Sequence, residues 1–255
     1  MSNDILLDKS DGAVWTITLN LPQALNAITM KMAAQLLQIL SDATEDEQAR
    51  CLVVTGAGIE AFSAGFDIKE MAGFDSAAMR DAFVKRDPLF KAIALHPLPV
   101  IAALNGRAFG AGALIAAAAD FRIASRNAEF KVTAVNYGSA NATWSLPRVV
   151  GLPTAKHILM TGRVVESEEG LAIGLYDELA DVDVVESALR LATQIASKPS
   201  TGIAAIKSLA NASFSGSLDA GWDAEFHHVL NQLEEGGQAG NQVFESFFET
   251  RTKDR

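Results

Sequence analysis

The chain has 255 residues, long for one domain and short for two, so we expect a single domain with an appendage. Apolar residues make up 49% of the chain and charged residues 20%, which excludes a disordered chain, a collagen and a disulfide-rich miniprotein. The formal net charge is −10 and no basic run occurs, so we expect no nucleic-acid partner, because an acidic surface repels phosphate backbones.

The cysteine content and the longest apolar run bear on the compartment. Cys51 is the only cysteine, opens an apolar segment typical of a buried strand, and cannot form an internal disulfide, so a reducing, cytoplasmic environment is expected. The start MSNDILLDKSDG lacks the basic residues and apolar stretch of a signal peptide. The longest strongly apolar run, residues 108–119, is too short for a bilayer, which needs about 20 residues. We expect no membrane association.

Short apolar strands alternate with helical segments through the first two thirds of the chain. Strands are predicted at residues 14–19, 51–55, 100–104 and 121–124, and helices from Thr29 to about Thr44, over 76–95 and from Gly110 onward. After Pro153 the strands fade, and helices are predicted at 155–160, 167–171, 184–196 and 203–209, with a final pair between about Leu218 and Thr250 broken at Gly236–Gly237. The pattern indicates an α/β core with a helical C-terminal third suited to docking or oligomerisation.

Several patterns that often mark chemistry are absent. No serine occupies a G-x-S-x-G nucleophile elbow. The segment Gly202–Ser208 has Ile206 where a phosphate loop needs its second glycine, and the glycines between 106 and 112 are wrongly spaced for dinucleotide binding. His227 and His228 are adjacent and cannot share one helix face, while the other two histidines are scattered, so we expect no metal site.

Two glycine-rich corners remain, one at residues 62–68 and one at 110–112. Each follows the C-terminal end of a predicted strand, which is where α/β folds place ligands. Each can expose backbone N–H groups, and the second adds the positive end of a helix dipole. Two converging donors would form an oxyanion hole. The alternative is a pair of ordinary glycine turns, which composition alone favours.

Five segments resemble the crotonase (enoyl-CoA hydratase/isomerase) superfamily, in its order and along nearly the whole chain. They are LNLPQALNA at 19–27, with Leu21 in place of an arginine, AFSAGFDIKEM at 61–71, PVIAALNG at 99–106 continuing to Asp120, LPRVVG at 146–151 and LMTGR at 159–163. The resemblance implies a crotonase-like spiral of ββα units in residues 1–195 and a helical C-terminal trimerisation region in residues 196–255. The assembly would be a homotrimer or a hexamer formed as a dimer of trimers.

The resemblance also implies a lyase or isomerase of fatty acid metabolism whose partner is an acyl-CoA thioester. Coenzyme A is then part of the substrate, and no separate cofactor is implied. By position, the oxyanion donors are the backbone amides of Phe66 and Ala111, and Ala111 replaces a glycine but keeps its N–H. The residues implied to line the CoA nucleotide are Ala24, Ala64, Asp67, Ile68 and Lys69.

Two of these residues have a simpler interpretation. Lys69 is equally well explained as a solvated loop lysine. Asp67 is equally well explained as a structural residue that holds its own turn through hydrogen bonds from its side chain to the backbone.

The acid positions of the family are empty in this chain. Hydration in the family usually needs two glutamates, and Leu114 and Ala134 stand at those positions. A third acid position, used by some isomerases, falls in a loop at 138–144 that is shortened here and holds no acid. An alkyl group cannot transfer a proton, so we expect standard hydratase activity to be weak or replaced. An acid could come from elsewhere, such as Asp75 or Asp87.

We therefore expect a family protein that binds an acyl-CoA thioester and stabilises its enolate, leaning towards an enzyme. The alternative is a non-catalytic acyl-CoA binding protein. The sequence carries no signal for the acyl chain, the pathway or the choice between trimer and hexamer.

Overall fold

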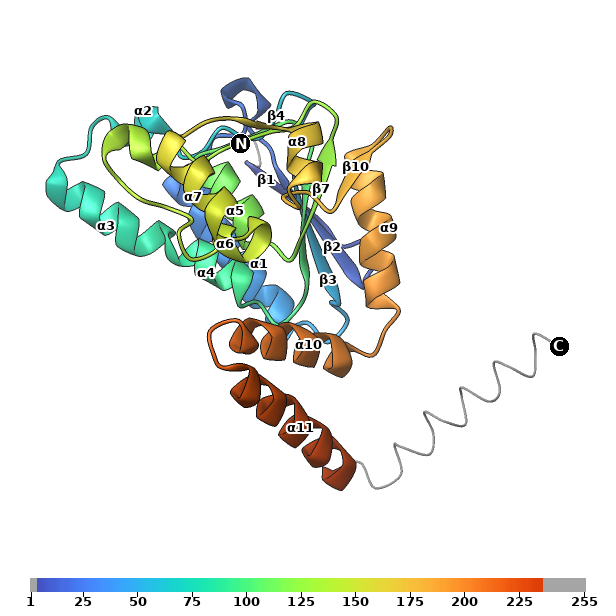
Figure 1. Ribbon diagram of the computed structural model, residues 1–255. Coiled ribbons are helices and arrows are strands. Elements are labelled where there is room, and N and C mark those ends of the chain that lie inside the picture. The colour runs from blue at the N-terminus through green and yellow to red at the C-terminus, as the bar shows by residue number, and fades with distance from the viewer. Residues whose placement is uncertain (1–3, 236–255) are drawn as a thin grey trace. The chain divides into compact units, whose positions relative to one another are not determined.

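The computed structural model of the chain describes residues 4–235 (Figure 1). These residues divide into two compact units, with the boundary between Ala204 and Ala205. The first unit contains two sheets and the helices that cover them. The second contains the end of α10 (Ser200–Ser213) and all of α11 (Leu218–Glu235).

The larger sheet has six strands in the order β1-β2-β3-β5-β7-β10. They are β1 (Ile5–Asp8), β2 (Val14–Leu19), β3 (Cys51–Gly56), β5 (Val100–Leu104), β7 (Phe121–Ser125) and β10 (Glu178–Ala180). β1 pairs antiparallel with β2, and all the other pairs are parallel. Every residue of β3 and β5 is buried, as expected where helices cover both faces of a parallel sheet.

The smaller sheet has four strands in the order β4-β6-β8-β9. They are β4 (Ala61–Ser63), β6 (Arg107–Phe109), β8 (Glu129–Lys131) and β9 (Val165–Glu166). Strands β4, β6 and β8 each follow a strand of the larger sheet, so the chain passes repeatedly from one sheet to the other before a helix returns it. This is the spiral of ββα units that the family resemblance implied, and the expected fold class is confirmed.

Helices cover both faces of the larger sheet, as Figure 1 shows for α9 (Val184–Ala196) on one face and α1 (Met30–Glu45), α4 (Pro88–Ala94) and α5 (Ala111–Ala118) on the other. Alternate residues of β3 point to opposite faces. Leu52 and Val54 belong to the cluster that includes α1, α4 and α5, whereas Cys51 and Val53 pack with α9. The thiol of Cys51 is fully buried, which confirms its place in the core.

Two predictions about element boundaries are wrong. The single helix expected at 76–95 is two helices, α3 (Ser76–Arg86) and α4, because Pro88 lacks an N–H and starts a new helix. Strands do not end at Pro153, since β9 and β10 follow it. Both are very short strands, so neither shows a clear alternation in the sequence.

The remaining elements are short helices of the first unit. They are two 3-10 turns, η1 (Pro22–Ala24) and η2 (Ala134–Tyr137), and the α-helices α2 (Ile68–Met71), α6 (Leu146–Val150), α7 (Leu152–Thr161) and α8 (Ser167–Ala172). Within residues 4–235 none of the helices combines the length and the apolar character that a bilayer crossing requires.

The trimerisation role assigned to residues 196–255 stays a prediction. The break at Gly236–Gly237 and the end of the last helix near Thr250 lie outside the described residues.

Candidate functional site

Two buried asparagines fix the start of the first corner. The side-chain amides of Asn26 and Asn105 both donate to the carbonyl oxygen of Ala61, at 2.7 and 3.1 Å. Asn26 also donates to the oxygen of Ala57, and Asn105 to that of Gly58. Strand β4 is therefore tied to two other segments directly before the corner. These asparagines were noted in the sequence only as parts of the segments 19–27 and 99–106, and their hydrogen bonds to Ala61 O were not predicted.

A one-residue parallel bridge between Ile28 and Phe66 sets the direction of the Phe66 amide. The N–H of Ile28 donates to Gly65 O at 2.8 Å, and the N–H of Asp67 donates to Ile28 O at 3.0 Å. Successive peptide groups of an extended segment point to opposite sides, so the N–H of Phe66 points away from Ile28. It has no acceptor among the described residues.

The second corner is the N-terminus of α5. Gly110 precedes the helix with φ of 51°, and no side chain caps it. The N–H of Leu114 donates to Gly110 O at 3.0 Å, which leaves the N–H of Ala111 without a partner inside the helix. The helix dipole adds positive potential at this end. An oxygen that carries negative charge is therefore a suitable partner.

The backbones of the two corners are in contact. A methyl group added to Gly65 would lie 3.2 Å from Ala111 N and 3.1 Å from Phe109 O, and one added to Gly112 would collide with Ser63 O. Gly65 also has φ of +107°, which L-residues rarely adopt. The structure thus brings Phe66 and Ala111 together, and glycine is required for the approach.

Leu114 and Ala134 lie beside the second corner. Leu114 is one turn into α5 from Ala111 and is buried. Ala134 is buried too, and it follows Thr133, whose hydroxyl lies 3.5 Å from a methyl group placed on Gly110. Alkyl groups therefore occupy both positions at which the family resemblance places glutamates.

The residues expected to line the CoA nucleotide come from two adjacent segments. The N–H of Ala64 donates to Leu25 O at 2.9 Å, which places the turn containing Ala24 beside the first corner. Ala64, Ile68 and Lys69 are exposed, and Ile68 is 74% exposed despite its apolar side chain. Lys69 lies in α2 and not in a loop, but its exposure is what a solvated lysine requires.

Asp67 and Glu70 cap helices. The carboxylate of Asp67 accepts the N–H groups of Lys69, at 2.8 Å, and Glu70, at 3.3 Å, and so caps α2. Glu70 accepts the N–H of Met30 at 2.8 Å, at the start of α1. The simpler interpretation of Asp67, in which its side chain holds its own turn by hydrogen bonds to the backbone, therefore agrees with the structure.

The two other candidate acids differ in their surroundings. Asp75 accepts the N–H of Ala78 at 2.8 Å and caps α3. Asp87 lies between α3 and α4, 3.3 Å from Arg86 Nε. Burial raises the pKa of Asp87, and the positive charge of Arg86 only partly opposes this rise. Arg86 in turn lies over the Phe66 ring, with its guanidinium carbon 3.7 Å from the ring centroid.

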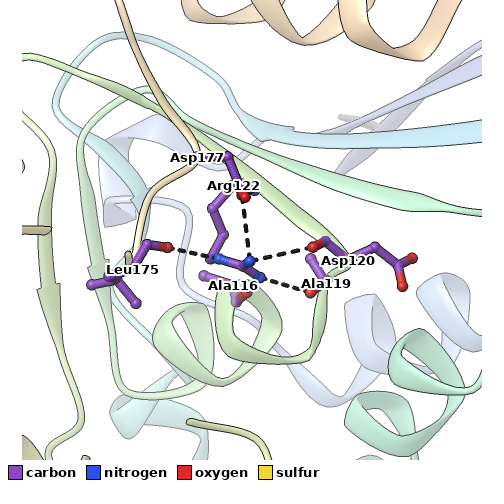
Figure 2. A network of polar contacts seen from close by, with 6 residues as sticks. All are labelled: Ala116, Ala119, Asp120, Arg122, Leu175 and Asp177. Carbon is purple, nitrogen blue, oxygen red and sulfur yellow. Dashed lines mark hydrogen bonds and ion pairs between the residues drawn. The ribbon is translucent and has the colours of Figure 1, made fainter. Parts of the chain in front are cut away.

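Arg122 holds the C-terminal end of α5, as Figure 2 shows. Its guanidinium donates to five oxygens, those of Leu175 (2.7 Å), Ala119 (2.7 Å), Ala116 (3.4 Å), Asp120 (3.2 Å) and the Asp177 carboxylate (3.4 Å). Burial lowers the pKa of Arg122, and the carboxylates of Asp177 and Asp120 oppose this. Sequence reasoning missed Arg122, although an arginine inside an apolar strand was a usable signal.

Within the described part of the chain, no three His, Cys, Asp or Glu side chains gather closely enough to hold a metal ion. The fold and the paired backbone corners define the class of protein, a crotonase-type ββα spiral.

Comparison with known proteins agrees with this class. The family model for enoyl-CoA hydratase/isomerase matches residues 9–254. The chain is 34% identical over 230 residues to the 1,2-epoxyphenylacetyl-CoA isomerase of Escherichia coli, covering 87% of each protein. It is 32% identical over 213 residues to the short-chain-enoyl-CoA hydratase of Clostridium acetobutylicum, covering 82% of this chain and 81% of that one. The crystal structure of an enoyl-CoA hydratase from Bacillus anthracis has a TM-score of 0.89 at 29% identity, covering 96% of each chain. The chain belongs to the enoyl-CoA hydratase/isomerase family.

Proposed function

We propose that the protein binds an acyl-CoA thioester and stabilises its enolate through the backbone N–H groups of Phe66 and Ala111. One observation carries the proposal: neither amide has an acceptor within residues 4–235, and their corners are in backbone contact. Donors fixed in advance at a developing oxyanion typically contribute about 10²–10³-fold in rate each. Family membership supports the thioester as the ligand.

The CoA nucleotide is proposed to lie against Ala24, Ala64, Asp67, Ile68 and Lys69. Contact between the Ala24 turn and the first corner supports a single surface for it. The exposed side chain of Ile68 would then gain an apolar partner. The charge of Lys69 suits a phosphate.

The reaction we propose is enolate chemistry without the two-glutamate route. Leu114 and Ala134 cannot move a proton, so water addition by that route should be slow. Isomerisation, hydrolysis or decarboxylation of a thioester needs the same oxyanion contacts with a different base or with none. Asp87 is the carboxyl that we propose for proton transfer, because it lies 3.3 Å from Arg86 Nε, and the Arg86 guanidinium lies over the Phe66 ring. Burial also raises the pKa of Asp87.

A non-catalytic acyl-CoA binding protein is the second candidate, and the alkyl groups at Leu114 and Ala134 favour it. Calorimetry with CoA and crotonyl-CoA, followed by absorbance of the conjugated enoyl group, separates the two. Binding with turnover contradicts the carrier, and binding without turnover of any thioester supports it. Absence of thioester binding contradicts both candidates.

The sharpest test removes one donor. Ala111→Pro deletes an N–H at the first helical position, where proline is tolerated, whereas Ala111→Ser keeps it. We expect the proline variant to lose about 10²-fold in turnover of a thioester, or to bind it more weakly, while the serine variant resembles the wild type. Equal behaviour of the two variants would remove Ala111 from the proposed site.

A second test restores the acids. We expect Leu114→Glu combined with Ala134→Glu to gain crotonyl-CoA hydratase activity, measured by loss of enoyl absorbance. The single variants are the controls and should gain much less, because the route needs both an acid and a base. A double variant that binds crotonyl-CoA but stays inactive would count against the assignment of these positions.

The assembly and compartment stay proposals. The exposed apolar side chains of α11, such as Leu218 at 92% and Trp222 at 61%, support a trimer or a dimer of trimers. Sedimentation should give three or six times the mass of one chain. A single buried cysteine supports a reducing, cytoplasmic location.

A further inference from the structure

Arg86 is a buried cation whose donors the protein satisfies poorly. Its side chain is 4% exposed. Nε donates to Asp87 at 3.3 Å, Nη1 donates to the sulfur of Met71 at 2.7 Å, and Nη2 has no acceptor among the described residues. A thioether sulfur is a weak acceptor. A buried charge is unfavourable without strong partners. The two terminal amino groups of this guanidinium can therefore bind a further hydrogen-bond acceptor.

The other buried arginine provides the contrast. Arg122 is similarly buried, yet its three nitrogens donate to five oxygens. That pattern is expected of an arginine with a purely structural role. Within residues 4–235, Arg86 has one oxygen partner, through Nε, and neither terminal amino group donates to an oxygen.

The position of Arg86 links it to the proposed thioester site. Its guanidinium carbon lies 3.7 Å from the centroid of the Phe66 ring and 4.5 Å from that of Phe83. These ring faces stabilise the charge but do not use the N–H groups in the guanidinium plane. The cation therefore packs directly against the side chain of the residue whose amide we propose as an oxyanion donor.

The unpaired amino group also stays within reach of a ligand. Nη2 is not among the fully enclosed polar atoms that lack a partner in the described chain, so its surface is not closed off by protein. A ligand oxygen could pair with Nη2 directly and take the place of the Met71 sulfur at Nη1.

We propose that Arg86 binds a carboxylate carried by the acyl chain, so that the substrate is the CoA thioester of a short dicarboxylic acid. This rests on the proposed function. The two outer nitrogens of a guanidinium match the two oxygens of a carboxylate. Because the cation packs against the Phe66 side chain, the site suits a short acyl chain, with its thioester oxygen at the Phe66 amide and its carboxylate at Arg86.

The experiment compares matched thioesters by calorimetry: glutaryl-CoA against pentanoyl-CoA, and succinyl-CoA against butyryl-CoA. Each pair differs by a carboxylate in place of a methyl group. We expect the wild type to bind the carboxylated member at least about tenfold more tightly, the range of a charge-assisted contact. Arg86→Met should abolish this preference, because it weakens binding of the carboxylated member far more than that of its neutral partner.

Lys85→Met is the matched control. Lys85 is the preceding residue of α3, carries the same charge and is 65% exposed. We expect this variant to keep the preference. If Arg86→Met does not fold, Arg86→Lys keeps a charge without the planar fork and should reduce the preference.

Three results would overturn the proposal. The wild type could bind both members of each pair equally, the preference could survive in Arg86→Met, or Arg86→Met could lose the same affinity for both members of a pair. The wild-type comparison is decisive by itself, because it needs no variant to fold. Absence of binding to every thioester would instead contradict the proposed function.

Discussion

The two ends of α5 have opposite surroundings. At its C-terminal end, the Arg122 guanidinium donates to the carbonyls of Ala116 and Ala119 and offsets the negative end of the dipole. At its N-terminal end no side chain of the described residues caps the helix, and the N–H of Ala111 has no acceptor among them. The fold thus satisfies the end that only anchors the helix and leaves donors at the end where we propose that a thioester binds.

The largest effect is expected from breaking the anchored end. Arg122→Met would leave several buried carbonyls and Asp177 without their partner, so we expect it to lower the free energy of unfolding by about 3–5 kcal/mol. Urea denaturation measures this change. Arg126→Met is the control: Arg126 is 58% exposed and pairs with Glu168 and Asp181 at the surface, so its loss should change the free energy of unfolding far less than the loss of Arg122. Equal losses would show that the anchor is unimportant.

The second-largest effect is expected from a substitution that pushes the N-terminus of α5 away from the first corner. Gly65→Ala forces an L-residue to φ of +107° and places its methyl group 3.2 Å from Ala111 N. We expect a loss of about 1–3 kcal/mol in stability and more than about tenfold in affinity for crotonyl-CoA, measured by denaturation and calorimetry. Gly73→Ala is the control, because nothing lies within 4 Å of its added methyl group. Unchanged affinity in Gly65→Ala would contradict the proposed site.

A smaller effect is expected at α2, whose N-terminus is capped, unlike that of α5. Asp67→Ala removes the cap and should lower stability by about 1 kcal/mol, whereas Asp67→Asn keeps a capping oxygen and should change it little. Affinity for CoA distinguishes a role of Asp67 in capping α2 from a direct contact with the ligand. Weaker binding in Asp67→Asn would mean that the charge itself contacts the ligand.

The smallest effect concerns Asp87 and the pH dependence of the free energy of unfolding. Because burial raises the pKa of Asp87 above its ordinary 3.8, the folded state retains a proton that the unfolded state has released. Stability contributed by Asp87 therefore falls as pH rises through the window just above 3.8. The stability of the wild type minus that of Asp87→Asn should decrease across this window, measured by urea denaturation at several pH values. An opposite slope would mean that the pairing with Arg86 dominates.

Much of the larger sheet could be predicted because its central strands are continuous apolar runs. Strands β3 and β5 appeared as such runs, and the predicted bounds of α9 agree with the structure. Strands β4, β6 and β8 have only three residues each, which is too short for an alternation to appear. The separation of α3 from α4 was readable from Pro88 but was missed.

The segments that form the candidate site could be predicted from the sequence, but the directions of their N–H groups could not. Small residues after two strands pointed to the two corners that the structure brings into contact, but the direction of the Phe66 N–H depends on its bridge with Ile28, far away in the chain. The surroundings of Arg86 and Arg122 likewise come from contacts between distant segments, such as that between Arg122 and Leu175. A sequence pattern shows an arginine but not which of its nitrogens lack an acceptor.

Helix α5 consists only of alanine, glycine, leucine and isoleucine, so nothing along it gains or loses a proton. The positive potential at its N-terminus, where we propose that the thioester oxygen binds, is therefore the same in mild acid and in mild base, as long as the protein is folded. A titration in the rate of any reaction at this site must report a group outside the helix or the substrate itself. An inflection in the acid range would direct attention to Asp87, whose pKa is raised by its burial.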